Sequence, residues 1–179
     1  GRLYFYETRE NFAWQIQKQP TSSGITRTGL GTTGQEININ GEGFFSAIGW
    51  ALATGDFNAD GRLDLVASGT GYASSIGRVY IFYRSGNLTT AAASADVIIG
   101  GSVTNEQFGG ALTSGDFNAD GRIDLAVSSY EYSNKTGRAY LFYNDGSWPA
   151  NAASADVTLT GESTLYYFGW SMAAGDFNA

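Results

Sequence analysis

The sequence predicts an all-β protein built from repeated four-stranded units. Three observations lead to this prediction: a repeat of 60 residues, four strand-like runs within each repeat, and a composition rich in glycine and aromatic residues. The 179 residues include 25 glycines, 11 tyrosines, 11 phenylalanines and 4 tryptophans, whereas charged residues make up only 15%. This composition is typical of sheets joined by many tight turns. The 42% of hydrophobic residues indicates a folded chain with a core.

The repeat is clearest in one eight-residue segment. Residues 55–62, Gly-Asp-Phe-Asn-Ala-Asp-Gly-Arg, recur unchanged at 115–122 and begin again at 175–179. The step of 60 residues is kept elsewhere, because 93–97 repeats as 153–157. Self-similarity at a fixed period indicates a repeat architecture, so it takes precedence over local propensities in predicting the fold.

Each repeat contains four strand-like runs separated by short turns. In the best-preserved copy they are residues 109–114, 123–128, 138–143 and 157–160. Four strands in a repeat of this length predict a β-propeller blade, with a solenoid as the alternative. The small residues of the first run suit a crowded central channel, and the aromatic residues of the third suit packing between neighbouring sheets.

The repeat divides the chain into one incomplete and two complete blades. Residues 1–47 are expected to hold the end of one blade plus a long loop, 48–107 and 108–167 one blade each, and 168–179 the first strand of a further blade. These are fewer blades than the four to eight of typical propellers. We therefore expect the remaining blades to come from the same longer chain or from other copies.

Composition excludes several classes of site. Cysteine and histidine are absent, which removes disulfides, thiolate and imidazole metal ligands, and every Ser-His-Asp arrangement. The formal net charge is −7, and without the seven repeat aspartates 10 acids would face 10 bases. The acidity is thus concentrated in one recurring feature, which favours cation binding and argues against nucleic acid and membrane insertion.

That feature is an aspartate-rich loop with oxygen-bearing side chains at loop positions 1, 3, 5 and 9 and glycine at position 6. Alternate residues of a tightly curled loop point inward, and the glycine permits the sharp turn. An oxygen-only, multiply charged set of ligands suits Ca²⁺. The predicted ligands are Asp56, Asn58, Asp60, the Arg62 carbonyl and Asp64; Asp116, Asn118, Asp120, the Arg122 carbonyl and Asp124; and, in an incomplete third copy, Asp176 and Asn178.

Two other kinds of loop share part of this pattern. An EF-hand requires a glutamate at position 12, where this chain has Ala67 or Val127. A loop that only forms Asx turns, without binding a metal, is the simpler alternative. Two complete copies, each with aspartate at position 9, favour calcium binding.

These residues resemble the FG-GAP repeat of integrin α-subunits and their bacterial relatives. The resemblance is carried by Phe108-Gly109, by residues 115–125 and by the aromatic-glycine segment 167–171. The closing Gly-Ala-Pro of the family is replaced by residues 67–69 and 127–129, and Ile48 stands where the family has phenylalanine. The resemblance implies a seven-bladed propeller, calcium on one face, an extracellular setting and ligand binding by loops on the opposite face.

The function expected is a calcium-binding, extracellular or cell-surface module for adhesion or ligand binding, with a protein or glycan as ligand. The alternatives are an architectural subunit of a surface assembly or filament, and a lectin-like targeting domain of a secreted enzyme. The chain itself is not expected to be an enzyme, because the calcium loops account for its paired aspartates. Four tryptophans could stack on sugars, but packing is favoured because two share a repeat position: Trp14, Trp50, Trp148 and Trp170.

Overall fold

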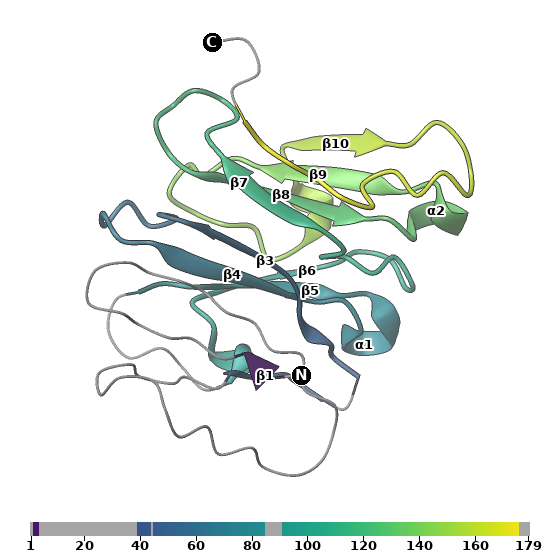
Figure 1. The fold of residues 1–179 in the computed structure, drawn as a ribbon, viewed down its shortest axis with the longest axis horizontal. Coiled ribbons are helices and arrows are strands. Elements are labelled where there is room, and N and C mark those ends of the chain that lie inside the picture. Colours follow the sequence, from purple (N-terminus) through teal and green to yellow (C-terminus); the bar gives the residue numbers. More distant parts are fainter. Residues whose placement is uncertain (1, 4–38, 44, 85–90, 176–179) are drawn as a thin grey trace, which may run out of the picture.

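The computed structural model describes residues 2–3, 39–43, 45–84 and 91–175, which form two four-stranded antiparallel sheets and one two-stranded sheet (Figure 1). The first sheet contains β3 (Ile48–Gly55), β4 (Asp64–Gly69), β5 (Arg78–Phe82) and β6 (Val97–Gly100). The second contains β7 (Leu112–Gly115), β8 (Asp124–Ser129), β9 (Arg138–Phe142) and β10 (Val157–Thr160). The small sheet pairs β1 (Arg2–Leu3) with β2 (Ile39–Asn40).

Each large sheet is a simple meander in which strands that follow one another in sequence are neighbours. The register repeats as well: Leu65 pairs with Phe82, and Leu125 pairs with Phe142. The prediction of an all-β protein with four-stranded antiparallel units is confirmed, and the two sheets are consistent with propeller blades. The first strand of the second sheet starts at Leu112 and not at residue 109, because Gly109 and Gly110 both donate to the Ser128 carbonyl in an irregular stretch.

Short helical turns were not predicted. They are α1 (Tyr72–Ser75) and α2 (Tyr132–Lys135), which join the second and third strands of each sheet, and the 3₁₀ turns η1 (Ala92–Ser94) and η2 (Ala152–Ser154). Inside α1 and α2 the backbone is left-handed, with φ of 48° at Ala73 and 54° at Asn134. They are therefore compact turns and contain no regular helix.

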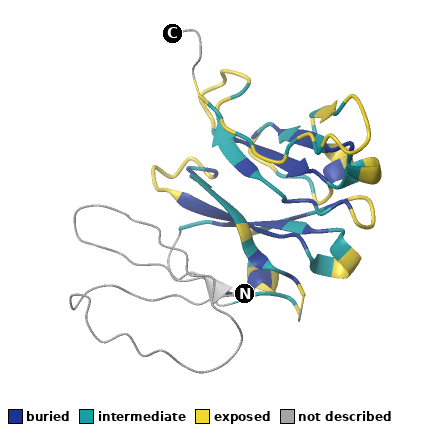
Figure 2. Cartoon of the chain, turned by 45° about the vertical axis from the view of Figure 1, so that its right-hand side comes forward, coloured by how far each residue is buried: buried dark blue, intermediate teal, exposed yellow. Residues whose placement is uncertain are grey.

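The two large sheets pack face to face, as consecutive blades do. A cluster of buried side chains lies between them, with Val66, Ile81 and Ile99 from the first sheet and Val127 and Phe142 from the second. Figure 2 shows this buried layer in dark blue. The first strands of the two sheets also touch, because the Ser114 hydroxyl donates to the Thr54 carbonyl at 2.8 Å. This is the arrangement expected of the innermost strands of neighbouring blades.

A second set of contacts ties the aspartate loop of the first sheet to the second sheet. The buried Asn144 amide donates to the carbonyls of Phe57, at 3.0 Å, and Ile123, at 3.2 Å. The Phe57 ring meets the edge of Trp148 with ring centroids 5.8 Å apart. The first loop therefore has part of its support in the neighbouring blade.

The outer faces of the two sheets differ. The outer face of the first sheet is covered by a cluster that includes Ile39, Leu65, Tyr80 and Phe82. On the outer face of the second sheet Leu159 is 49% exposed. Its counterpart one repeat earlier, Ile99, is fully buried because the second sheet packs against it. The second sheet thus presents an uncovered apolar face within the described residues.

Candidate calcium loops

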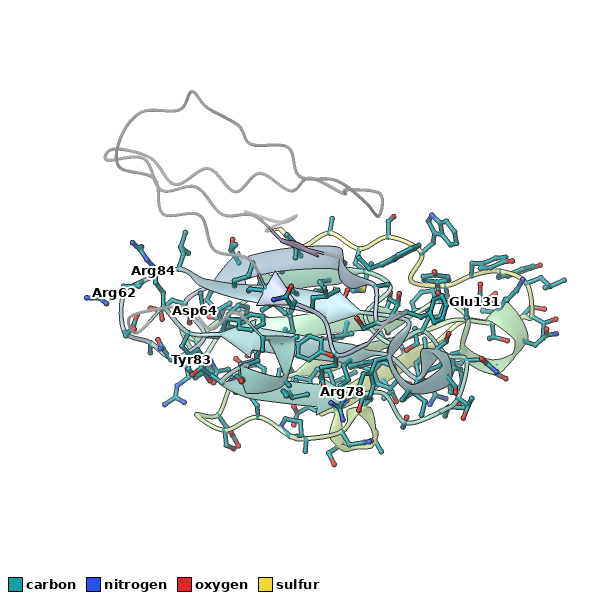
Figure 3. The ribbon with its side chains drawn as sticks, turned by 90° about the horizontal axis from the view of Figure 1, so that it is seen from below. Arg62, Asp64, Arg78, Tyr83, Arg84 and Glu131 are labelled. Atoms are coloured by element: carbon teal, nitrogen blue, oxygen red, sulfur yellow. The ribbon has the colours of Figure 1, made fainter. Side chains whose placement is uncertain are left out.

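The two complete aspartate loops occupy equivalent places in the fold. Residues 56–63 join β3 to β4, and residues 116–123 join β7 to β8. Figure 3 shows Arg62 and Asp64 at one end of the molecule, with Glu131 at the opposite end beside the short helical turns. The position-9 aspartates, Asp64 and Asp124, are the first residues of β4 and β8 and are buried. The sheet therefore fixes the last side chain of each loop.

The first residue of each loop closes the turn by accepting two backbone hydrogen bonds. The Asp56 carboxylate accepts from the N–H of Asp60 at 3.0 Å and of Gly61 at 2.8 Å. Asp116 accepts from the N–H of Asp120 at 3.1 Å and of Gly121 at 2.9 Å. The two loops thus have the same geometry to within a few tenths of an ångström.

The middle residues continue this pattern. The Asn118 side-chain oxygen accepts from the N–H of Asp120 at 3.0 Å, and the Asp120 carboxylate accepts from the N–H of Arg122 at 2.8 Å. The turn also requires positive φ, which is 86° at Gly121 and 61° at Ala119. Glycine adopts such angles without strain, whereas an alanine in this region costs about 1–2 kcal/mol. The backbone therefore favours glycine at position 6, as predicted.

The buried aspartate anchors the loop to the next turn of the sheet. The Asp64 carboxylate accepts from the N–H of Phe57 at 2.9 Å and of Arg84 at 2.8 Å. Burial raises the pKa of Asp64 above its ordinary value; the amides of Arg84 and Phe57 oppose that rise, and the charges of Asp60 and Asp56 add to it. The three carboxylates of one loop are thus close enough to repel each other.

The structure brings the predicted ligands of each complete copy into one loop. Within the described residues, no group of three acidic side chains is arranged to hold a metal ion. The Arg62 guanidinium donates to the Arg84 carbonyl at 3.4 Å. The assignment of individual ligands stays a prediction, and Asp176 and Asn178 lie outside the described residues.

The chemical type of these donors nevertheless suits a calcium ion. Every candidate side chain offers oxygen, and a carboxylate oxygen that accepts one N–H keeps a further lone pair. Three carboxylates in one loop supply the negative charge that a hard divalent cation prefers. A bound cation would also offset the mutual repulsion of these groups.

Sequence reasoning missed two glutamates that accept hydrogen bonds from core tyrosines, because these glutamates do not recur at one repeat position. Glu106 is buried, and its carboxylate accepts from the Tyr140 hydroxyl at 2.9 Å. Glu42 accepts from the Tyr80 hydroxyl at 2.9 Å and pairs with Arg78 at 3.0 Å. The tyrosines do recur with the repeat, and their need for a partner was the available signal.

The tryptophans behave differently from one another. Trp148 packs against the core between the sheets, as predicted. Trp50 and Trp170 share a repeat position, but they remain 48% and 64% exposed, so the expectation of packing is wrong for much of their surface. Trp14 lies outside the described residues.

Comparison with known proteins identifies the repeat. Residues 56–127, which include both aspartate loops, match the family of FG-GAP-like repeats. The chain carries FG-GAP-like repeats. Repeats of this family commonly bind Ca²⁺. The described residues contain no helix that is long and apolar enough to cross a membrane.

The chain is also similar to a family of phospholipases. It is 30% identical over 148 residues to the phosphatidylinositol-glycan-specific phospholipase D of Bos taurus, a match covering 75% of this chain and 17% of that protein. The Mus musculus enzyme of the same name is 33% identical over 145 residues, again 17% of its length. The chain thus spans less than a fifth of the curated relatives it matches.

Proposed function

We propose that this FG-GAP-like region is a calcium-binding β-propeller module that serves extracellular adhesion or ligand binding. The observation that carries the proposal is the duplicated aspartate loop, which has the same oxygen donors and the same turn in both copies. In each loop the side chains at positions 1, 3, 5 and 9, with the position-7 carbonyl, would hold Ca²⁺. The position-9 aspartate would link the ion to the sheet.

Calcium would stabilise the folded state and would take no part in a catalysed reaction. A ligand that binds only the folded state, at about 100 times its Kd, stabilises that state by roughly 2.7 kcal/mol. Because Phe57 contacts Asn144 and Trp148 in the connection between β9 and β10, ordering the first loop would also support the packing between blades. No catalytic role is proposed, since the loops account for the paired aspartates.

A second candidate is a non-catalytic, targeting part of a larger secreted enzyme. It is favoured by the similarity to phospholipases of which this chain covers only 17%. An architectural role in a surface assembly is the third. In each case the remaining blades would come from the same longer chain or from other copies, and the uncovered face of the second sheet is where another blade would pack.

Calcium binding can be tested with one isosteric substitution. Asp120→Asn removes one charge from the second loop but keeps an oxygen for the Arg122 N–H. We expect chelation to lower the Tm of the unmodified chain and calcium to raise it by a smaller amount in Asp120→Asn, as followed by scanning calorimetry. Glu162→Gln, at an exposed acid outside the loops, is the matched control and should respond like the unmodified chain. A Tm that does not change with calcium would contradict the proposal.

A further inference from the structure

An exposed aromatic surface lies at the end of the second sheet opposite its aspartate loop. β8 starts at Asp124 beside the loop and runs to Ser129, and Tyr130 follows at the far end. There Trp170 packs on Tyr130, with ring centroids 4.8 Å apart, and meets Tyr167 edge-on at 5.7 Å. We call these three residues the aromatic platform.

Tyr130 is the buried support of the platform, and Trp170 is its solvent-exposed ring. Tyr130 is buried and donates from its hydroxyl to the Gln107 side-chain oxygen at 2.7 Å. Room for the Tyr130 ring depends on Gly110, where a Cβ would come within 2.3 Å of that ring. Trp170 keeps 64% of its surface exposed. An exposed tryptophan on a fixed support has already lost most of the freedom that binding would otherwise remove.

The exposure of Trp170 does not depend on an uncovered neighbouring blade. Trp50 occupies the same position two repeats earlier, in the first sheet, where the second sheet is packed beside it, and it is still 48% exposed. The middle repeat has Gly110 at this position, which leaves the space that Tyr130 fills. This repeat position therefore faces solvent even where the following sheet is packed beside it.

Polar groups surround the platform. Glu131 follows Tyr130 and lies beside the helical turns in Figure 3. Burial raises the pKa of Tyr130, and the negative charge of Glu131 adds to that rise. The Lys135 amine sits 5.3 Å from the centre of the Tyr167 ring. Hydrogen-bond donors and acceptors thus flank a flat apolar surface.

Three classes of ligand fit this surface poorly. A small apolar molecule needs an enclosing cavity, which a raised ring does not provide. A quaternary ammonium needs several ring faces around one point, but Tyr130 and Trp170 touch each other and Lys135 already covers Tyr167. A nucleic acid would stack on the ring but is repelled by a net charge of −7.

We propose that the aromatic platform of Tyr130, Tyr167 and Trp170 binds a neutral carbohydrate by stacking a sugar ring on Trp170. A pyranose with equatorial hydroxyls presents a flat C–H face to an indole, while its hydroxyls extend sideways toward groups such as Glu131 and Lys135. This proposal names the ligand class for the binding role proposed above and rests on that role, but it does not require the calcium loops to be filled.

The test uses the whole chain and three neutral sugars: cellotriose, chitotriose and lactose. We expect at least one to give a saturable change in tryptophan fluorescence and a matching calorimetric isotherm. Trp170→Ala should weaken that binding by at least about tenfold, and Trp170→Phe by less, because a smaller ring remains. Leu63→Ala, at an exposed apolar side chain in the aspartate loop of the first sheet, should leave the binding unchanged.

Specific outcomes would overturn the proposal. The first is that none of the three sugars binds at millimolar concentration. The second is that Trp170→Ala binds as tightly as the unmodified chain. The third is that the chain prefers a heparin oligosaccharide to all three sugars. Circular dichroism verifies that each variant is folded, and Trp170→Phe provides the test if Trp170→Ala does not fold. Repeating the titration with a chelator separates the two proposals, because sugar binding without a calcium-dependent Tm would support the platform and refute the calcium module.

Discussion

At the scale of single residues, the buried Glu106–Tyr140 pair shows how the fold satisfies a carboxylate without a cation. Glu106 accepts from the Tyr140 hydroxyl and from the N–H groups of Ser102 and Val103. Burial raises the pKa of Tyr140 to about 12, and the Glu106 charge and hydrogen bond contribute to the rise. The protonated phenol is therefore a structural requirement.

The sign of the resulting pH dependence follows from linkage. Unfolded tyrosine titrates near 10, so between about pH 10 and 12 the unfolded chain has lost a proton that the folded chain keeps. Stability contributed by Tyr140 is complete below pH 10 and decreases as pH rises toward 12. Over two pH units the loss amounts to about 2–3 kcal/mol.

Tyr140→Phe tests this pair. At pH 8 we expect the variant to lose about 1–3 kcal/mol of unfolding free energy, because the Glu106 carboxylate loses a buried donor. Between pH 10 and 11 its stability should decrease less steeply than that of the unmodified chain. Urea unfolding at several pH values measures both effects. Parallel pH profiles for the two proteins would show that Tyr140 does not keep its proton in the folded state.

At the scale of elements, the strands and loops could be predicted because the sequence repeats them. Residues such as Asp64 and Asp124 mark the same turn twice, and the 60-residue step places each strand by comparison with its copy. The helical turns could not be predicted in this way. Their left-handed backbone falls on Ala73 and Ser133 as well as on Asn134, and of these residue types only asparagine is enriched at positive φ, so local preference alone does not impose it.

The sequence predicts which residues belong to the candidate site but not how their side chains are arranged. The spacing of Asp116, Asn118 and Asp120 indicates the donors, whereas the amide hydrogen bonds that these side chains accept depend on the folded turn. The support of the first loop by Asn144 was also beyond sequence reasoning. It joins residues 87 positions apart, and the equivalent residue of the previous repeat is Arg84.

Gly121→Ala tests the backbone of the second loop. Gly121 has φ of 86°, and a Cβ there would meet no atom within 4 Å, so the substitution changes conformational preference and not packing. We expect a loss of about 1 kcal/mol, since the strain of a left-handed alanine exceeds the entropy removed from the unfolded chain. Calcium affinity should decrease with it. Denaturant unfolding and calorimetric titration measure the two effects.

A matched glycine provides the control. Gly100, in β6, has no positive φ, and its added Cβ would approach the Ala150 carbonyl only to an ordinary 3.7 Å. Gly100→Ala should therefore be neutral or stabilising by about 0.4–1 kcal/mol. Equal losses from both substitutions would mean that the loop conformation is not responsible.

At the scale of the whole molecule, the two sheets have nearly the same strands but different surroundings. Phe108 is fully buried between the sheets, whereas Phe168, its counterpart one repeat later, is 40% exposed. The face around it includes Ala126, Leu141 and Leu159. Contiguous exposed apolar surface of this kind marks an interaction site or an association hazard.

The last prediction follows from that face: the described sheets should associate through it, with a second copy where no other blade covers it. Leu159→Lys places a charge on the exposed face, and Val103→Lys adds the same charge at a comparably exposed residue, 44% accessible, in the loop after β6. Burying a charge without a partner is unfavourable, so Leu159→Lys should dissociate the complexes while Val103→Lys leaves them intact. Sedimentation velocity over a range of concentrations measures the distribution of species. If the unmodified chain sediments as one species of 19.0 kDa at every concentration, the face does not drive association.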